Sequence, residues 1–107
     1  MNLENPVWLF IGEGGVFPGG VFDNFDLAKE WIKKNRLSGV LTAYPLNEGS
    51  FDWALRFDCV GMRKEKMEAK KLDPKFIGSF SSASQPHFHF TDGVAEGLLG
   101  QPPGKTA

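Results

Sequence analysis

Short apolar runs separated by glycine and proline mark the first part of the chain. Val7–Ile11 consists of five apolar residues, most of them β-forming types, with Pro6 before it and Gly12 after it. The run is too short for a core helix, so it predicts a central strand buried on both faces. Gly20–Phe22 and Gly39–Tyr44 predict two further short strands by the same pattern.

The clearest helical periodicity lies between the second and third of these strands. Apolar residues recur there at i, i+3 and i+4, while lysines and acidic residues occupy the other positions. The predicted stripe consists of Leu27, Ala28, Trp31, Ile32 and Leu37. Asp23 or Asn24 can cap the N-terminus of this segment. The pattern therefore predicts one amphipathic helix packed on one face of a sheet.

The second half of the chain is less regular. Phe51–Phe57 alternates apolar and polar residues, which favours a half-buried strand, although a short helix remains possible over seven residues. Residues 61–75 are densely charged and predict a loop or an exposed helix. Residues 76–82 and His87–Thr91 are predicted as two strands of a hairpin. That hairpin is expected at a sheet edge because Pro86, between them, cannot donate to a ladder.

These elements predict the α+β class. We expect a small antiparallel or mixed sheet of about five or six short strands, with one amphipathic helix packed on one face. The other face then needs cover from the charged segment, from aromatic side chains or from a partner subunit. Residues 1–93 are expected to form a single globular domain. Residues 94–107 are rich in glycine and proline and predict a flexible C-terminal tail.

Composition changes this picture only in part. The chain has 107 residues, which suits one domain, and its ten Phe and three Trp can build a small core. The net charge of −1 gives no general attraction to nucleic acid or to anionic membranes. Cys59 is the only cysteine, so an internal disulfide framework is excluded. No signal peptide or membrane-spanning run is expected, and the predicted location is the cytoplasm of a bacterium.

Catalytic and cofactor motifs are weak. The glycine-rich segment Gly12–Gly20 lacks the third glycine of a dinucleotide loop, and Val21 and Phe22 stand where a phosphate loop needs Lys and Ser or Thr. There is no G-x-S-x-G motif for a nucleophilic serine. Cys59 has no neighbouring basic residue that would lower its pKa. No cofactor is predicted, and the chain is not expected to be an enzyme.

The pair His87 and His89 is the sharpest chemical feature. Residues two apart on a strand point to the same face, so the two imidazoles could converge on a metal ion, with Asp92 as a third ligand. The competing interpretation is an exposed polar face opposite buried Phe88 and Phe90. No other histidine is available to complete a metal site.

Two other binding surfaces are possible. His87 and His89, with the neighbouring Ser84 and Gln85, can form a polar hydrogen-bonding surface. The three tryptophans are expected in the core, although Trp53, if partly exposed, could serve as an interface anchor. The basic stretch Arg63–Lys71 could bind single-stranded RNA beside exposed aromatic residues. Because acidic residues interrupt this stretch and no RNA-binding signature is present, nucleic-acid binding is not favoured.

Several strings in the chain resemble a family of small, mostly bacterial domains of unknown function. The resemblance covers about residues 6–93. The strings are Gly20–Phe22, Ala28 with Trp31 and Ile32, Leu37–Leu46, Phe51–Ala54 and Phe76–Gly93. It implies a compact domain and no particular chemistry.

Taken together, the sequence favours a non-enzymatic binding or regulatory module that associates with a protein partner or with itself. A metal-binding protein using His87 and His89 is the alternative hypothesis, and single-stranded RNA binding is a further one. Membrane association is not expected.

Overall fold

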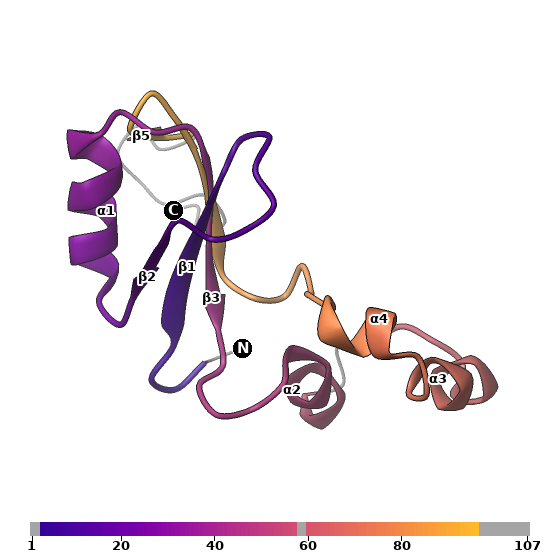
Figure 1. Cartoon of the computed structure of the whole chain (residues 1–107). Helices are drawn as coiled ribbons and strands as arrows, with labels where there is room; N and C mark the ends of the chain where they lie inside the picture. Colours follow the sequence, from indigo (N-terminus) through magenta and orange to yellow (C-terminus); the bar gives the residue numbers. More distant parts are fainter. Residues whose placement is uncertain (1–2, 58–59, 97–107) are drawn as a thin grey trace.

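A five-stranded antiparallel sheet forms the centre of the protein. The computed structural model describes residues 3–57 and 60–96, and its strands follow the order β2–β1–β3–β4–β5. The bounds are β1 Val7–Gly12, β2 Gly20–Phe22, β3 Gly39–Tyr44, β4 His87–Thr91 and β5 Val94–Ala95. The predicted α+β class and the small antiparallel sheet are confirmed. Figure 1 shows the sheet nearly edge-on, with one helix on one side and three small helices at its lower end on the other.

Helix α1, Phe25–Lys34, is the predicted amphipathic helix. Asn24 is its N-cap, with the side-chain oxygen accepting a hydrogen bond from the Leu27 backbone N–H at 3.0 Å. Ala28 and Ile32 are fully buried against the sheet, whereas Leu27 is 56% exposed. The predicted stripe was therefore one residue too wide, because Leu27 lies beyond the side of the helix that the sheet can cover.

The main core lies between α1 and the sheet. Alternate residues of β1, β3 and β4 point towards the helix, and seven buried residues form one cluster. They are Trp8, Phe10, Ala28, Ile32, Leu41, Ala43 and Phe90. Trp31 is half-buried and its ring packs against Phe10 and Phe22 at centroid distances of 5.7 and 5.4 Å. Burial of each large side chain in this cluster contributes roughly 1.5–3 kcal/mol, so the ring-rich composition supplies the core of a small domain.

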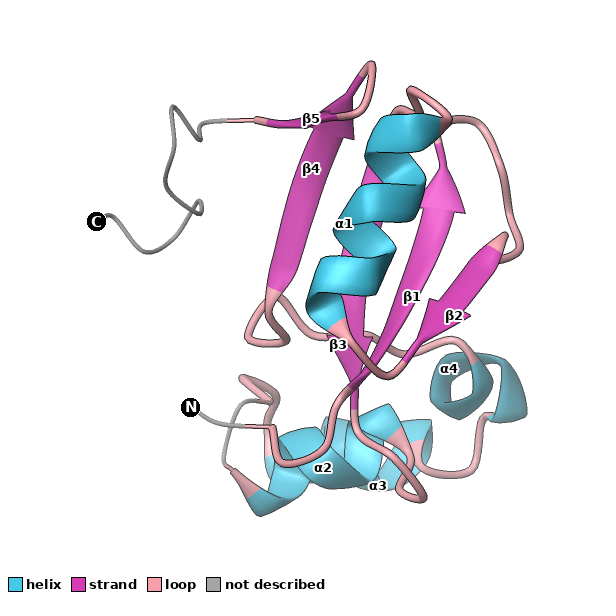
Figure 2. Ribbon diagram, turned by 90° about the vertical axis from the view of Figure 1, so that its left-hand side faces the viewer, coloured by secondary structure: helices cyan, strands magenta, loops and turns pink. Residues whose placement is uncertain are grey.

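Three short helices form a second packing unit, which we call the helical lobe. Its members are α2 Ser50–Arg56, α3 Lys64–Lys70 and α4 Pro74–Gly78. The rings of Phe51, Phe76 and Phe80 pack on one another at centroid distances of 5.1–5.5 Å and join α2 to α4. Figure 2 shows this lobe below the sheet, away from α1.

The segment 51–57, for which the alternation favoured a strand, is helical over Ser50–Arg56. Phe51 and Ala54 lie three residues apart and are both buried, while Asp52 is exposed. The alternation predicted a strand because Ala54 was grouped with the polar residues Asp52 and Arg56. In the structure, Ala54 lies on the buried side of the helix.

The predicted strand 76–82 is also wrong. Pro74 occupies the first turn of α4, and the Asp73 side chain accepts a hydrogen bond from the Lys75 N–H at 3.0 Å. Proline at the first helical position and an aspartate cap favour a helix start, so Asp73 and Pro74 open a helix here. Phe76 and Phe80 then meet on one side of the turn, at 5.5 Å.

The hairpin of the second half joins β4 to β5 and not residues 76–82 to β4. Thr91 pairs with Val94 across a two-residue turn, in which Asp92 and Gly93 have φ values of 53° and 85°. Positive φ at both positions is the type I′ geometry, for which Asp-Gly is a favoured sequence. The sheet thus continues past Gly93 through Val94 and Ala95, and residues 97–107 of the expected tail lie outside the described residues.

Within the described ranges, none of the helices has the length and apolar character required to cross a membrane.

Candidate functional site

Among residues 3–57 and 60–96, no helix covers most of one face of the sheet (Figure 1). The residues that alternate with the core residues project from this side, which we call the open face. They are Val7, Leu9, Ile11, Val21, Val40, Thr42, Tyr44, His87, His89, Thr91 and Val94. None of these strand residues is an Asp, Glu, Lys or Arg, but the Glu96 carboxylate reaches this side at the β4–β5 edge, where it accepts a hydrogen bond from the Thr91 hydroxyl at 2.6 Å. The open face is therefore mainly apolar, with the two histidines towards one edge.

The strand register places these side chains in rows across the sheet. Val21, Leu9, Thr42 and His87 form one row, because each is the cross-strand partner of the next. Ile11, Val40 and His89 form the following row in the same way. Leu9, Ile11 and Val40 are half-buried, and Val21 is 62% exposed. Solvent thus reaches an apolar surface that runs from β2 to β4.

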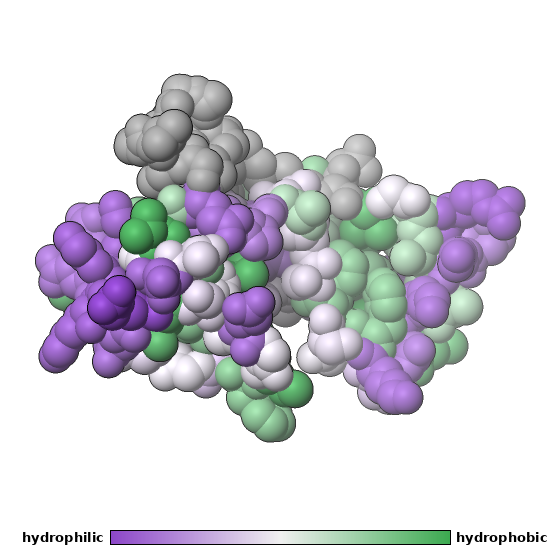
Figure 3. Space-filling view, turned by 90° about the horizontal axis from the view of Figure 1, so that it is seen from above, coloured by the Kyte–Doolittle hydropathy of each residue, from purple (hydrophilic) through white to green (hydrophobic). Residues whose placement is uncertain are grey.

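The loop between β1 and β2 extends this apolar surface. It rises on the side of the sheet opposite α1 (Figure 1), and it carries Val16 and Phe17, which are 76% and 83% exposed. Figure 3, seen from above, shows polar surface on α1 at one end of the molecule and on the helical lobe at the other, with paler and apolar surface between them. An exposed aromatic side chain such as Phe17 is typical of an interface anchor.

His87 and His89 lie on the same exposed side of β4, as the alternation predicted. Their rings are 5.7 Å apart between centroids and nearly perpendicular. The His87 Nδ1 lies 2.8 Å from the Gln85 carbonyl oxygen, so that nitrogen carries a proton and donates. In the neutral ring, Nε2 then remains as an acceptor for a ligand.

Asp92 does not complete a metal site with the two histidines. No group of three or more His, Cys, Asp or Glu side chains lies close enough to hold a metal ion within residues 3–57 and 60–96. Asp92 belongs to the β4–β5 turn, and its backbone N–H donates to the Ser38 hydroxyl at 3.0 Å. This turn rests on the C-terminal end of α1, where Gly93 N–H donates to the Leu37 carbonyl at 2.8 Å.

Gln85 and Ser84 have different environments, although both were expected at a polar surface. Gln85 is only 1% exposed. Its Nε2 donates to the Ala43 carbonyl at 2.9 Å, and its Oε1 accepts from the Ser82 N–H at 2.8 Å. Ser84 is exposed. Gln85 therefore holds the loop before β4 against β3, and it is not available to a ligand at the surface.

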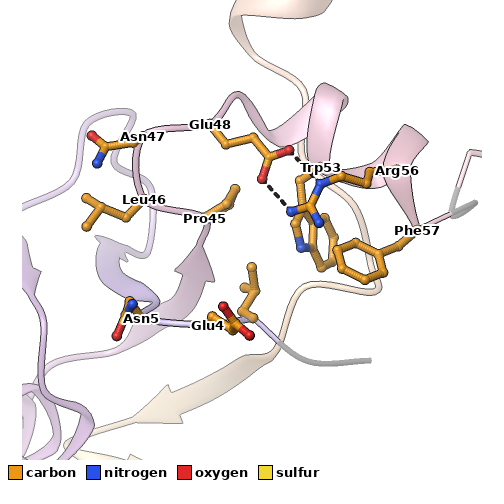
Figure 4. A pocket seen from close by; sticks show the side chains of 10 residues that line it. Glu4, Asn5, Pro45, Leu46, Asn47, Glu48, Trp53, Arg56 and Phe57 are labelled. Atoms are coloured by element: carbon orange, nitrogen blue, oxygen red, sulfur yellow. Dashed lines mark hydrogen bonds and ion pairs between the residues drawn. The ribbon is translucent and has the colours of Figure 1, made fainter.

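Trp53, predicted as a possible exposed anchor, is 1% exposed. It lines a cleft of about 450 Å³ between residues 3–5, the turn after β3 and helix α2, which we call the Trp53 cleft. The lining residues are Leu3, Glu4, Asn5, Pro45, Leu46, Asn47, Glu48, Trp53, Arg56 and Phe57. The indole Nε1 is buried and has no hydrogen-bond acceptor among the described residues. Figure 4 shows this nitrogen on the side of the indole that faces Glu4.

An ion pair closes one side of the Trp53 cleft. Arg56 Nε and Nη2 donate to the two carboxylate oxygens of Glu48 at 3.0 and 2.8 Å. These hydrogen bonds lower the pKa of Glu48 below its ordinary value and raise the pKa of Arg56. The guanidinium also lies 4.6 Å from the centroid of the Phe57 ring. One edge of the guanidinium, formed by Nε and Nη2, thus binds the carboxylate in a bidentate pair.

Sequence reasoning found Trp53 but not its charged neighbours. Glu4 lies far from Glu48 and Arg56 in the chain, these two are eight residues apart, and each looks like an ordinary surface residue. The spacing of Glu48 and Arg56 matches no local helical pair, because Glu48 precedes α2. Only the fold brings the three together.

The basic stretch forms the exposed helix α3, which has no buried residue. One neighbouring aromatic residue, Phe76, is half-buried in the ring cluster of the lobe, with Lys70 Nζ 5.3 Å from its ring centroid. Cys59 lies outside the described residues.

Comparison with protein families gives one match. The family described as Domain of unknown function (DUF7710) matches residues 7–96. The chain belongs to this family. The predicted membership in a family of uncharacterised domains is thereby confirmed. The match ends three residues beyond the expected domain end at residue 93, and it includes β5. No curated protein and no solved structure matches the chain.

Proposed function

We propose that this DUF7710 domain is a non-enzymatic binding module that associates with a second copy of itself through the open face. The observation that supports this most is a sheet surface whose strand side chains include no Asp, Glu, Lys or Arg, and over most of which the described residues place no helix. Small α+β domains normally bury both apolar sides of a sheet, or leave one side polar. Here no helix of the described residues covers most of the side opposite α1. Its acidic groups lie at one margin, where the Glu96 carboxylate accepts a hydrogen bond from the Thr91 hydroxyl at 2.6 Å and Glu13 lines the same hollow.

A second copy suits this surface better than a charged partner. A two-fold interface brings the same patch of both copies together, so like charges in the patch would face one another. The central part of the open face, on β1 and β3, contains no Asp, Glu, Lys or Arg and avoids that repulsion, whereas Glu13 and Glu96 lie at its margin. Two sheets packed face to face would give four layers, with the α1 helices outermost. Phe17, on the exposed loop, supplies an aromatic anchor at the margin.

The test is the molar mass in solution, measured by size-exclusion chromatography with light scattering. The wild-type chain should have twice the monomer mass at high protein concentration. Val21→Lys places a charge on the open face at a side chain that is 62% exposed, so it should give monomers without loss of folding. A dissociation constant at least tenfold weaker is expected, since a buried lysine loses hydration worth more than ~1.4 kcal/mol.

Leu27→Lys is the matched control. Leu27 is similarly exposed, at 56%, but it lies on α1 on the other side of the sheet. This variant should dimerise like the wild type. A wild-type chain that stays monomeric at high concentration, or equal weakening by both substitutions, would contradict the proposal.

A further inference from the structure

The Trp53 indole is a buried donor without an acceptor among the described residues. Most buried polar groups in proteins make at least one hydrogen bond, and leaving one unpaired costs about 1–3 kcal/mol. The indole is 1% exposed, yet it lines the Trp53 cleft. An acceptor supplied from the cleft would recover that cost.

The size and construction of the Trp53 cleft suit a small ligand group. Its volume of about 450 Å³ falls within the range of small-molecule sites, roughly 300–1,000 Å³. The walls come from three separate segments, which are the residues before β1, the turn after β3 and α2. Trp53 and Phe57, whose ring centroids lie 5.6 Å apart, provide the aromatic part of the lining.

The charges of the Trp53 cleft favour a positive ligand. Arg56 is held by both carboxylate oxygens of Glu48, so this pair is internally neutral. Glu4 makes no ion pair with any described residue, so the charged residues that line the cleft have a net charge of −1. A cation beside aromatic rings gains further attraction from the ring faces.

We propose that the Trp53 cleft binds a peptide segment that carries an arginine or lysine side chain. The peptide carbonyl oxygen accepts the hydrogen bond of Trp53 Nε1, and the basic side chain pairs with Glu4. Any basic peptide carries both a carbonyl oxygen and a positively charged side chain. One such ligand can therefore engage Trp53 Nε1 and the Glu4 carboxylate together. This site is additional to the self-association proposed above, because none of its lining residues belongs to the open face.

The test uses ¹⁵N-labelled protein and its indole N–H signals, one for each of Trp8, Trp31 and Trp53. The signals are assigned by triple-resonance experiments, so no tryptophan variant is needed. The probe is the blocked tripeptide acetyl-Ala-Arg-Ala-amide, and the control probe carries norleucine in place of arginine. The arginine peptide should shift the Trp53 signal and leave those of Trp8 and Trp31 unchanged. The norleucine peptide should shift it much less at the same concentration.

A pair of charge variants then tests the ligand chemistry. Glu4→Gln should weaken binding of the arginine peptide about fivefold, the effect of one exposed ion pair. Glu30→Gln removes an exposed carboxylate from α1 and should leave the affinity unchanged. An unshifted Trp53 signal, equal shifts with the two peptides, or equal affinities of the two variants would each overturn the proposal. The Val21→Lys protein should bind the arginine peptide with the wild-type affinity. Peptide binding can therefore be judged separately, even if the chain does not dimerise.

Discussion

At the scale of single residues, burial separates side chains that the sequence groups together. His87 and His89 are exposed on one side of β4, which strand alternation alone predicts. Gln85 was expected at a surface and Trp53 was only a candidate anchor, and both are buried. Their polar groups also differ in hydrogen bonding. The Gln85 amide has backbone partners for its nitrogen and its oxygen, whereas Trp53 Nε1 has no partner among the described residues.

Gln85 should therefore matter for stability more than for binding. Gln85→Ala leaves the buried Ala43 carbonyl and the Ser82 N–H without their partners. The free energy of unfolding should fall by about 2–3 kcal/mol, measured by urea denaturation. Ser84→Ala removes an exposed hydroxyl one residue away and should change the free energy of unfolding by less than ~0.5 kcal/mol. Similar losses in the two variants would show that the Gln85 amide does not hold the loop.

At the scale of elements, α1 and the first four strands were predicted from the sequence, whereas α2, α4 and β5 were not. The apolar stripe and cap of α1 specify a helix by themselves, and β1, β2, β3 and β4 follow from their short β-forming runs. Seven residues were too few to distinguish α2 from a strand. For α4 a local signal existed in the Asp73–Pro74 start, and for β5 in the Asp92–Gly93 turn before Val94.

The N-cap of α1 gives a prediction at this scale. Asn24→Ala removes the acceptor of the Leu27 N–H and should lower the free energy of unfolding by about 1 kcal/mol. Asn24→Asp keeps a side-chain oxygen at the cap and should retain most of the wild-type stability. Thermal unfolding followed by circular dichroism measures both. Equal loss in Ala and Asp variants would mean that the cap bond contributes little.

At the scale of the whole molecule, the aromatic residues divide between two packing units. One set fills the core under α1, and the rings of Phe51, Phe76 and Phe80 hold the helical lobe together. Figure 2 shows the lobe attached at one end of the sheet. The Trp53 cleft lies at this junction, and the open face lies beside it. Both proposed surfaces thus arise from how the two units are placed.

This division predicts unequal local stability. Amide hydrogens of β1, β3 and α1 should exchange slowest, because Phe10, Leu41 and Ile32 are almost fully buried. Those of α3 should exchange much faster, since that helix buries no residue. Native-state hydrogen exchange followed by NMR measures the difference, with α1 as the matched helix. Equal protection of α1 and α3 would contradict the two-unit description.

The sequence by itself determined the α+β class, the capped helix α1 and the facing of His87 and His89. Those features depend on local periodicity and capping, which any stretch of chain carries in its own residues. Only the tertiary structure decided that Gln85 and Trp53 are buried, that no helix of the described residues covers most of the open face, and that Glu4, Glu48 and Arg56 meet at one cleft. Each of these depends on contacts between segments far apart in the chain, and such contacts leave no pattern in the local sequence.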